Sequence, residues 1–312
     1  MSGRDASAAT GTAARTAGPR QLAWARRGRA VGAFWAQYRR NRAGVVGLVV
    51  LAVFVLSALL VPWLVGEDAL SVTRPPGQPL QPPSGEFLLG TDRSGRSVLD
   101  LVLWGSRVSL TVGFAATFIS IALGALIGIL AGHFHGWLSA TLLRITDWFL
   151  VMPTLVLAVA LAAVLGRSLS TIIIAIGVTS WPTTARLVRA QTLAVEARPY
   201  IERARALGGG HWHVMTRHVL PNVMPIVLAQ TTLMVAGAIL TESTVAFLGL
   251  GDPTIPSWGS TIQAARDVGA VSSGMWWYIL PPGIAIALMA LAFTLCGRAI
   301  EGVLNPRLRT RA

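Results

Sequence analysis

The sequence contains no lysine, and charged residues make up only 12% of its 312 residues. A soluble globular domain has about 25% charged residues, so a chain this poor in charge lacks the polar surface that water requires. Without lysine there is no Walker A loop, in which a lysine reaches the nucleotide phosphates, and no Schiff-base chemistry. We therefore expect the chain to hydrolyse no ATP by itself and to hold no catalytic or cofactor-binding residue.

Cysteine is almost absent as well. The one cysteine, Cys296, lies inside an apolar run, so no disulfide can form within the chain, and we interpret it as a small buried hydrophobic residue. Apolar residues are abundant instead: they make up 53% of the chain, and the mean hydropathy is +0.61. Lipid is the solvent that tolerates such a composition.

Six apolar stretches follow the N-terminal segment, and each is near or above the roughly 20 residues that a helix needs to cross a bilayer. They span residues 44–65, 105–132, 138–165, 169–192, 222–248 and 277–303. Pro153 in the third stretch and Pro182 in the fourth predict kinks. The expected fold class is therefore an all-α integral membrane protein with six transmembrane helices.

The placement of the arginines predicts the orientation. All 26 basic residues are arginine, and the formal net charge is +13. If the N-terminus is cytoplasmic, twenty arginines fall in inner segments and five in outer ones, in agreement with the positive-inside rule. We expect cytoplasmic tails over 1–43 and 304–312, a cytoplasmic loop over 193–220 and an external loop over 66–104. Because the arginines follow the topology and do not form one patch, no nucleic-acid partner is expected.

Within the N-terminal tail, the first twenty residues are mostly small and predict disorder. Residues 21–42 combine aromatic side chains with many arginines, and they predict a helix on the membrane surface. Membrane lipid is therefore an expected partner of the tail.

Glycines recur at four-residue spacing on the second apolar stretch, at Gly124, Gly128 and Gly132. Small residues at this spacing let another helix approach closely. The pattern fits a seam with a partner subunit and packing within this chain equally well, and both interpretations stay open.

The inner loop between the fourth and fifth stretches predicts two short helices. Pro199 suits the first turn of a helix, and Gly208 suits its C-terminal cap. Glu202 places a negative charge in the first turn, where the helix dipole is positive. A second helix is expected to start near His211 and to stop before Pro221. The result is a hairpin that projects into the cytosol.

These residues resemble the coupling motif of ABC-importer permeases. The motif is a glutamate, an alanine two residues later, a glycine six residues later, and a closing His-x-Leu-Pro-Asn run. Here these positions are Glu202, Ala204, Gly208, His218, Leu220, Pro221 and Asn222. In that family the hairpin docks into a cleft on a cytosolic ATPase subunit, so the resemblance implies that these residues couple the chain to an ATPase. Arg203 stands where the family usually has alanine, and a long cation there needs an acidic or polar partner.

Further motifs in the same order resemble the C-type permeases of dipeptide and oligopeptide importers. They are Leu89–Asp92 with Gly95 and Arg96, Arg107–Leu110, Asp147 with Pro153, Trp181 and Pro182 with Arg186 and Arg189, Phe247–Gly251, and Pro256–Gly259. The resemblance covers roughly residues 40–308.

This resemblance implies a type I importer permease of the inner membrane with a cytoplasmic coupling hairpin. It implies a second homologous permease subunit, two ATPase subunits, an external peptide-binding protein and a peptide substrate. ATP and Mg²⁺ would be held by the ATPase subunits, which would drive alternating access. No metal is expected in this chain, because its histidines lack a cysteine or carboxylate set at ligand spacing.

One carboxylate lies deep in the fifth stretch, at Glu242 between Thr241 and Ser243. Such a group is costly in lipid and normally faces a cavity or a partner, so these three residues and Asp147 are the candidate translocation pathway. Glu242 has two open interpretations, a pathway residue that meets the ammonium group of a peptide or a hydrogen-bond node between helices. For Asp147, an ion pair with Arg144 at helical spacing is favoured over a gating role.

Two other function classes remain to be weighed. A secondary transporter or channel predicts several buried carboxylates and inverted repeats, whereas this sequence has one deep carboxylate and no evident repeat. An intramembrane enzyme needs a nucleophile with a base or a metal motif, and neither is evident. The sequence leaves open whether the solute is a dipeptide, a longer peptide or a non-peptide such as a nickel chelate.

Overall fold

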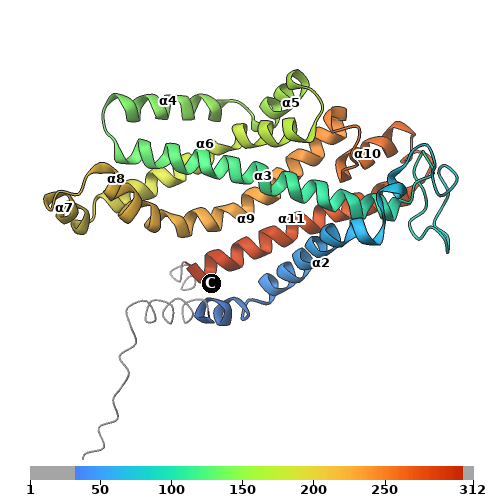
Figure 1. Cartoon of the computed structure of the whole chain (residues 1–312), viewed down its shortest axis with the longest axis horizontal. Helices are drawn as coiled ribbons and strands as arrows, with labels where there is room; N and C mark the ends of the chain where they lie inside the picture. The colour runs from blue at the N-terminus through green and yellow to red at the C-terminus, as the bar shows by residue number, and fades with distance from the viewer. Residues whose placement is uncertain (1–31, 305–312) are drawn as a thin grey trace, which may run out of the picture.

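The computed structural model describes residues 32–304. Within this range the chain forms an elongated bundle of helices (Figure 1), and the one bridge between extended segments joins Thr91 and Ser97. Residues 1–31 and 305–312 lie outside the described range, and with them the first half of the predicted surface helix over 21–42.

Among the described residues, five helical segments are long and apolar enough to cross a membrane, and a bent pair makes a sixth. The long helices are α2 (Arg42–Leu64), α3 (Val98–His133), α6 (Leu169–Glu196), α9 (Leu220–Val245) and α11 (Trp276–Leu304). The bent pair is α4 (Trp137–Val151) with α5 (Thr154–Leu165). The shorter elements are η1 (Glu67–Leu70), α7 (Pro199–Ala206), α8 (His211–Val214) and α10 (Trp258–Asp267). The predicted all-α membrane fold is confirmed, with six spans when the bent pair counts as one.

Successive spans run in opposite directions, so the two ends of the bundle carry different segments (Figure 1). One end holds α7, α8, the start of α2 and the end of α11. The other end holds α10 and the segment over 66–97 that precedes α3. The predicted coupling loop therefore lies at the same end as both ends of the described chain.

The third predicted span is interrupted at Pro153. The axes of α4 and α5 meet at 88°, with Pro153 between them. Proline has no amide proton and its ring clashes with the preceding turn, so one helix ends at Val151 and the next begins at Thr154. The kink predicted there is confirmed and amounts to a full break. Pro182 lies inside α6, which runs past it as one helix.

Helix α3 begins at Val98, earlier than the predicted start at residue 105. The Ser97 hydroxyl caps it by accepting a hydrogen bond from the Asp100 amide at 3.3 Å, and Asp100 adds an acidic group to the first turn. The predicted boundary is wrong because the apolar run was taken to begin at residue 105, although residues 98–104 are apolar apart from Asp100.

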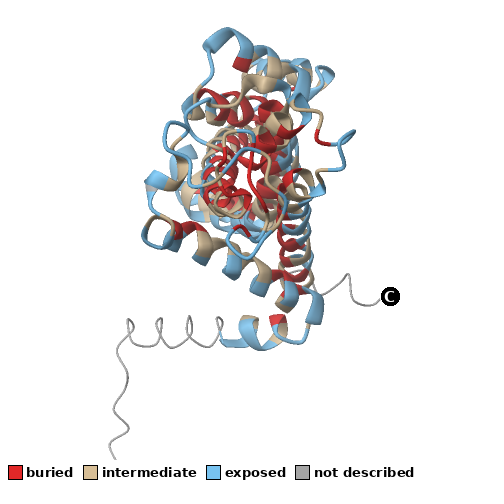
Figure 2. Ribbon diagram, turned by 90° about the vertical axis from the view of Figure 1, so that its right-hand side faces the viewer, coloured by how far each residue is buried: buried red, intermediate tan, exposed pale blue. Residues whose placement is uncertain are grey.

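The glycines of α3 bring it against α6. A Cβ atom at Gly124 would lie 2.6 Å from the Cβ of Thr184, and one at Gly132 would lie 2.7 Å from the Cβ of Thr192. Gly128 lies between them in the same helix. These glycines serve packing within the chain, so their interpretation as a seam with a partner subunit is wrong. Figure 2, which views the bundle along its length, shows buried residues at its centre and exposed residues around it.

Candidate functional site

The predicted coupling hairpin begins with α7. Pro199 occupies the first position of the helix, and Gly208 follows its end with φ at +87°. The Gly209 amide donates to the Ala204 carbonyl at 2.9 Å, and the Gly208 amide donates to the Arg205 carbonyl at 2.9 Å. These two bonds form a Schellman motif. The prediction that Gly208 closes the first helix is confirmed.

The side chain of Ile201 packs α7 against the bundle. Ile201 is fully buried in a cluster whose other buried members are valines from α6, α8, α9 and the turn η2 (Met215–Val219). At the tip of the hairpin, by contrast, Leu207 is 89% exposed and Trp212 is 76% exposed. Large apolar side chains that stay exposed together are typical of a surface that binds another protein.

The second arm of the hairpin does not stop before Pro221, and that prediction is wrong. From His211 the chain continues through α8 and a π-turn, η2 (Met215–Val219), directly into α9. In this turn the Leu220 amide donates to the carbonyl of Met215, one residue further back than in an α-helix. Pro221 is tolerated because it falls in the first turn of α9. The hairpin is therefore continuous with a membrane span.

Several residues of the coupling motif gather on one face. An open hollow of about 550 Å³ is lined by Arg203, Ala204, Gly208 and His218, together with neighbouring residues of both arms. Glu202 is exposed beside them, and within residues 32–304 neither it nor Arg203 has an ion-pair partner. Of the remaining motif residues, Leu220 and Pro221 lie beyond the π-turn at the start of α9 and do not line the hollow.

A set of polar side chains behind the hairpin was missed by the sequence analysis. Glu196 at the end of α6 pairs with Arg205 of α7 and with Nδ1 of His133 at the end of α3. Nε2 of His133 lies 2.8 Å from Nδ1 of His211 in α8. Because a carboxylate only accepts hydrogen bonds, Nδ1 of His133 carries the proton in the contact with Glu196. These four residues, which we call the base cluster, connect α3, α6, α7 and α8.

The sequence carries only a weak signal for the base cluster. His133 and His211 are 78 positions apart, so no helical or motif spacing joins them. The shared feature is that all four members lie at the inner ends of predicted spans or in the coupling loop. That placement was the only available indication that they meet.

Glu242 is 1% exposed. The Ser109 hydroxyl of α3 donates to its Oε2 at 3.0 Å, and the Ser243 hydroxyl donates to the same oxygen at 3.3 Å. Thr241 instead donates its hydroxyl to the Gly237 carbonyl at 2.9 Å. These contacts fit the interpretation of Glu242 as a hydrogen-bond node between α3 and α9. A role in the pathway stays a prediction.

Asp147 pairs with Arg186 of α6, and not with Arg144 as predicted. The Arg186 guanidinium donates to Asp147 Oδ1 at 2.6 Å, and both side chains are about half exposed. The pair forms between helices because α4 packs against α6. Exposed pairs of this kind contribute about 0–1 kcal/mol. Glu242 has no contact with this pair, so the four pathway candidates do not form one site among the described residues.

Comparison with known proteins places these features in context. Residues 124–310 match the family described as binding-protein-dependent transport system inner membrane component. Residues 32–83 match the N-terminal transmembrane domain of oligopeptide transport permease C.

Curated relatives cover most of the chain. It is 40% identical over 273 residues to a putative peptide transport system permease protein of Brucella abortus, covering 86% of this chain and 90% of the relative. It is 36% identical over 285 residues to the di/tripeptide transport system permease protein DppC of Pseudomonas aeruginosa, covering 89% and 93%. It is 35% identical over 266 residues to the probable D,D-dipeptide transport system permease protein DdpC of Escherichia coli, covering 84% and 87%.

Proposed function

Since the chain belongs to the family of binding-protein-dependent transport system inner membrane components, we propose that it carries short peptides across the inner membrane as a permease subunit driven by partner ATPases. It is a multi-pass membrane protein and a permease, not an ATPase. The relatives are named for peptides, di- and tripeptides and D,D-dipeptides, which supports a peptide as the solute.

The hairpin of α7 and α8 is the observation that carries this proposal. Ile201 and the base cluster hold it on the bundle, whereas Arg203 and Leu207 stay exposed at its surface. Its second arm continues into α9 without a loop. An ATPase subunit that binds the exposed face and moves on ATP binding would therefore move a membrane helix directly.

The proposed complex contains four kinds of partner. A second permease subunit completes the pathway, two ATPase subunits dock on the hairpins, an external binding protein delivers the peptide, and lipid surrounds the spans. ATP and Mg²⁺ are held by the ATPase subunits, since this lysine-free chain has no phosphate-binding loop of its own.

We place both termini and the hairpin in the cytoplasm. The twenty arginines of the inner segments against five in the outer ones support this orientation. The arrangement of the bundle supports it too, because the start of α2, the end of α11 and the hairpin lie at one end.

Reconstitution of the whole complex in vesicles tests the function. The expected result is uptake of a labelled short peptide that requires ATP on the hairpin side, the ATPase subunits and loaded binding protein. Peptide uptake that persists without the ATPase subunits would favour a secondary transporter or channel. Uptake of a nickel chelate with no uptake of peptide would replace the proposed substrate.

A further inference from the structure

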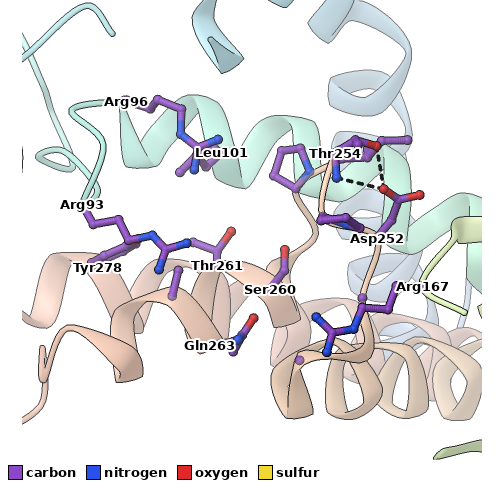
Figure 3. A pocket seen from close by; sticks show the side chains of 16 residues that line it. Arg93, Arg96, Leu101, Arg167, Asp252, Thr254, Ser260, Thr261, Gln263 and Tyr278 are labelled. Atoms are coloured by element: carbon purple, nitrogen blue, oxygen red, sulfur yellow. Dashed lines mark hydrogen bonds between the residues drawn. The ribbon is translucent and has the colours of Figure 1, made fainter. Parts of the chain in front are cut away.

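A pocket of about 270 Å³ lies at the end of the bundle opposite the coupling hairpin. Figure 3 shows Arg93 and Arg167 entering it from two sides, with Ser260, Thr261 and Gln263 of α10 between them. Neither the coupling hairpin nor Glu242 lines this pocket.

Arg93 projects from a turn with fixed geometry. The Asp92 carboxylate is buried, and it accepts hydrogen bonds from the amide of Arg96 at 2.9 Å and from its guanidinium at 2.6 Å and 2.8 Å. Gly95 has φ at +84°, and a Cβ there would lie 2.2 Å from the Gly77 carbonyl oxygen. The charge of Arg96 is thus balanced within the turn, and Arg93 is presented beside it.

Arg167 is placed by contacts between two loops. Asp252 accepts a hydrogen bond from the Leu169 amide at 3.1 Å, and from the amide and hydroxyl of Thr254 at 2.9 Å and 2.6 Å. Burial alone would raise the pKa of Asp252, but these hydrogen bonds lower it below its ordinary value. The carboxylate is therefore ionised near neutral pH, and its oxygens are occupied in joining the two loops.

Two exposed arginines remain in the pocket, Arg93 and Arg167. Within the part of the chain that the structure describes, neither Arg93 nor Arg167 forms an ion pair. Tyr278 is fully buried in the pocket wall. Its hydroxyl lies near the Arg93 backbone but makes no hydrogen bond of ordinary geometry with any described residue. The Tyr278 hydroxyl is covered, whereas Arg93 and Arg167 are exposed, so the positive charge of these two arginines is what the pocket offers to a ligand.

We propose that this pocket binds the C-terminal carboxylate of the peptide as it enters the permease from the external binding protein. The guanidinium group of arginine matches a carboxylate with two parallel N–H···O bonds, and Arg93 and Arg167 supply two such groups. Every linear peptide with a free C-terminus ends in this carboxylate whatever its side chains, so the site suits an importer of many sequences. This inference rests on the peptide function proposed above.

The size of the pocket fits one end of a peptide. Pockets that enclose a whole small ligand have volumes of about 300–1,000 Å³, whereas this one has about 270 Å³. The terminal residue therefore occupies the pocket while the rest of the peptide extends away from it.

The reactivity of an engineered thiol tests the pocket without the binding protein. Gln263→Cys is made together with Cys296→Ser, in a complex whose other subunits lack cysteine. An anionic thiosulfonate should modify this thiol about tenfold faster than a cationic one of similar size, and Arg93→Gln or Arg167→Gln should lower that ratio. A peptide with a free C-terminus, at millimolar concentration, should slow the modification, and its C-terminal amide should not. Arg74→Gln is the matched control.

Transport by the reconstituted complex supplies the second test. For one peptide and its amide, both bound by the binding protein, Arg93→Gln and Arg167→Gln should each lower uptake of the free acid on the order of tenfold. Uptake of the amide and stimulation of the ATPase by loaded binding protein should not change. Arg74→Gln should change none of these, because Arg74 precedes the same turn but lies outside the pocket.

Three results would overturn the proposal. An equal fall in the uptake of the free acid and of the amide would show that the two arginines have a structural role only. A fall in ATPase stimulation would assign them to docking of an acidic surface of the binding protein. Thiol modification without a charge preference or protection by the free acid would exclude an anion site. If instead the unmodified complex takes up no peptide, the proposed function fails, and the thiol experiment still decides whether the pocket binds a carboxylate.

Discussion

His133 at the end of α3 is hydrogen-bonded to Glu196 at the end of α6, although 63 positions separate the two residues in the sequence. The bond joins the two helices that pack along the glycines, and Glu196 extends it to Arg205 in α7. The hairpin is thus held on the bundle by charged contacts as well as by the burial of Ile201.

Glu196→Gln tests whether these charged contacts matter for transport. The change keeps the size of the side chain but removes the negative charge of Glu196, which contacts both His133 and Arg205. Hydrogen bonds to charged groups contribute about 1.5–3 kcal/mol each. We expect normal insertion, with a several-fold fall in peptide uptake and in ATPase stimulation by loaded binding protein. Glu301→Gln, on an exposed acid of α11, is the control. Normal coupling in Glu196→Gln would leave the base cluster without a role in transport.

Gly208→Val should uncouple transport from ATP hydrolysis. A side chain in the left-handed conformation costs about 1–2 kcal/mol, too little to unfold the bundle but enough to displace the second arm. Gly210→Val is a close control, because Gly210 has φ at −71° and, as at Gly208, open space around an added Cβ. We expect normal amounts of both variants in the membrane, with uptake lost in the first and retained in the second. Equal uptake by the two variants would show that the left-handed conformation of Gly208 is not required for coupling.

Arg203→Ala and Arg205→Ala should behave differently although they are two positions apart. Arg205 pairs with Glu196, so its loss should weaken the hairpin and lower ATPase stimulation. Arg203 has no ion-pair partner within the described chain, and alanine restores the usual family residue, so its loss should be tolerated. Stimulated ATPase activity of reconstituted complexes measures both. A larger defect in Arg203→Ala would indicate that an acidic residue of the ATPase pairs with it.

Glu242→Gln separates the two interpretations of the buried acid. Glutamine can still accept the hydrogen bond from Ser109, so a structural node predicts nearly normal assembly and an equal, small effect on all peptides. Glu242→Leu would then reduce the amount of assembled complex, because it leaves the Ser109 hydroxyl without this partner, at a cost of about 1–3 kcal/mol. Selective loss in Glu242→Gln of peptides with a free amino terminus would instead support a pathway role. Uptake of matched free and N-acetylated peptides is the measurement.

Cysteine labelling in intact cells tests the orientation. Leu207→Cys in the hairpin and Val271→Cys between α10 and α11 are well suited, because both residues are highly exposed. In a Cys296→Ser background, an impermeant thiol reagent should label the second variant and not the first. Labelling of Leu207→Cys from outside would reverse the proposed topology.

The spans and the first arm of the hairpin could be predicted because their signals are local. The length of an apolar run decides whether a helix crosses the membrane, and the proline and glycine of α7 mark its two ends. The same local reasoning placed the start of α3 too late, because Asp100 interrupts the apolar residues that follow the cap at Ser97.

Contacts between distant segments could not be predicted in the same way. Asp147 was assigned to Arg144 by helical spacing, but the packing of α4 on α6 gave it Arg186. Proline at position 221 predicted a helix end, whereas a π-turn before it let the helix continue. The partners of Glu196 lie on α3 and α7, and only the folded bundle brings them together.

The helical segment that starts at His211 and runs to Leu250 has 40 residues and is about 60 Å long at 1.5 Å per residue. It contains two π-turns, η2 and η3 (Ala246–Leu250), and Gly249 in the second has φ at +84°. In a straight helix of this length, a tilt of about 5° about one end displaces the other end by about 5 Å. The hairpin is at one end, and Gly249, near the other, belongs to the wall of the pocket that Arg93 and Arg167 line. A displacement of the hairpin would therefore reach that wall along one continuous helical segment, in which the two π-turns and Gly249 are the places where the segment can bend.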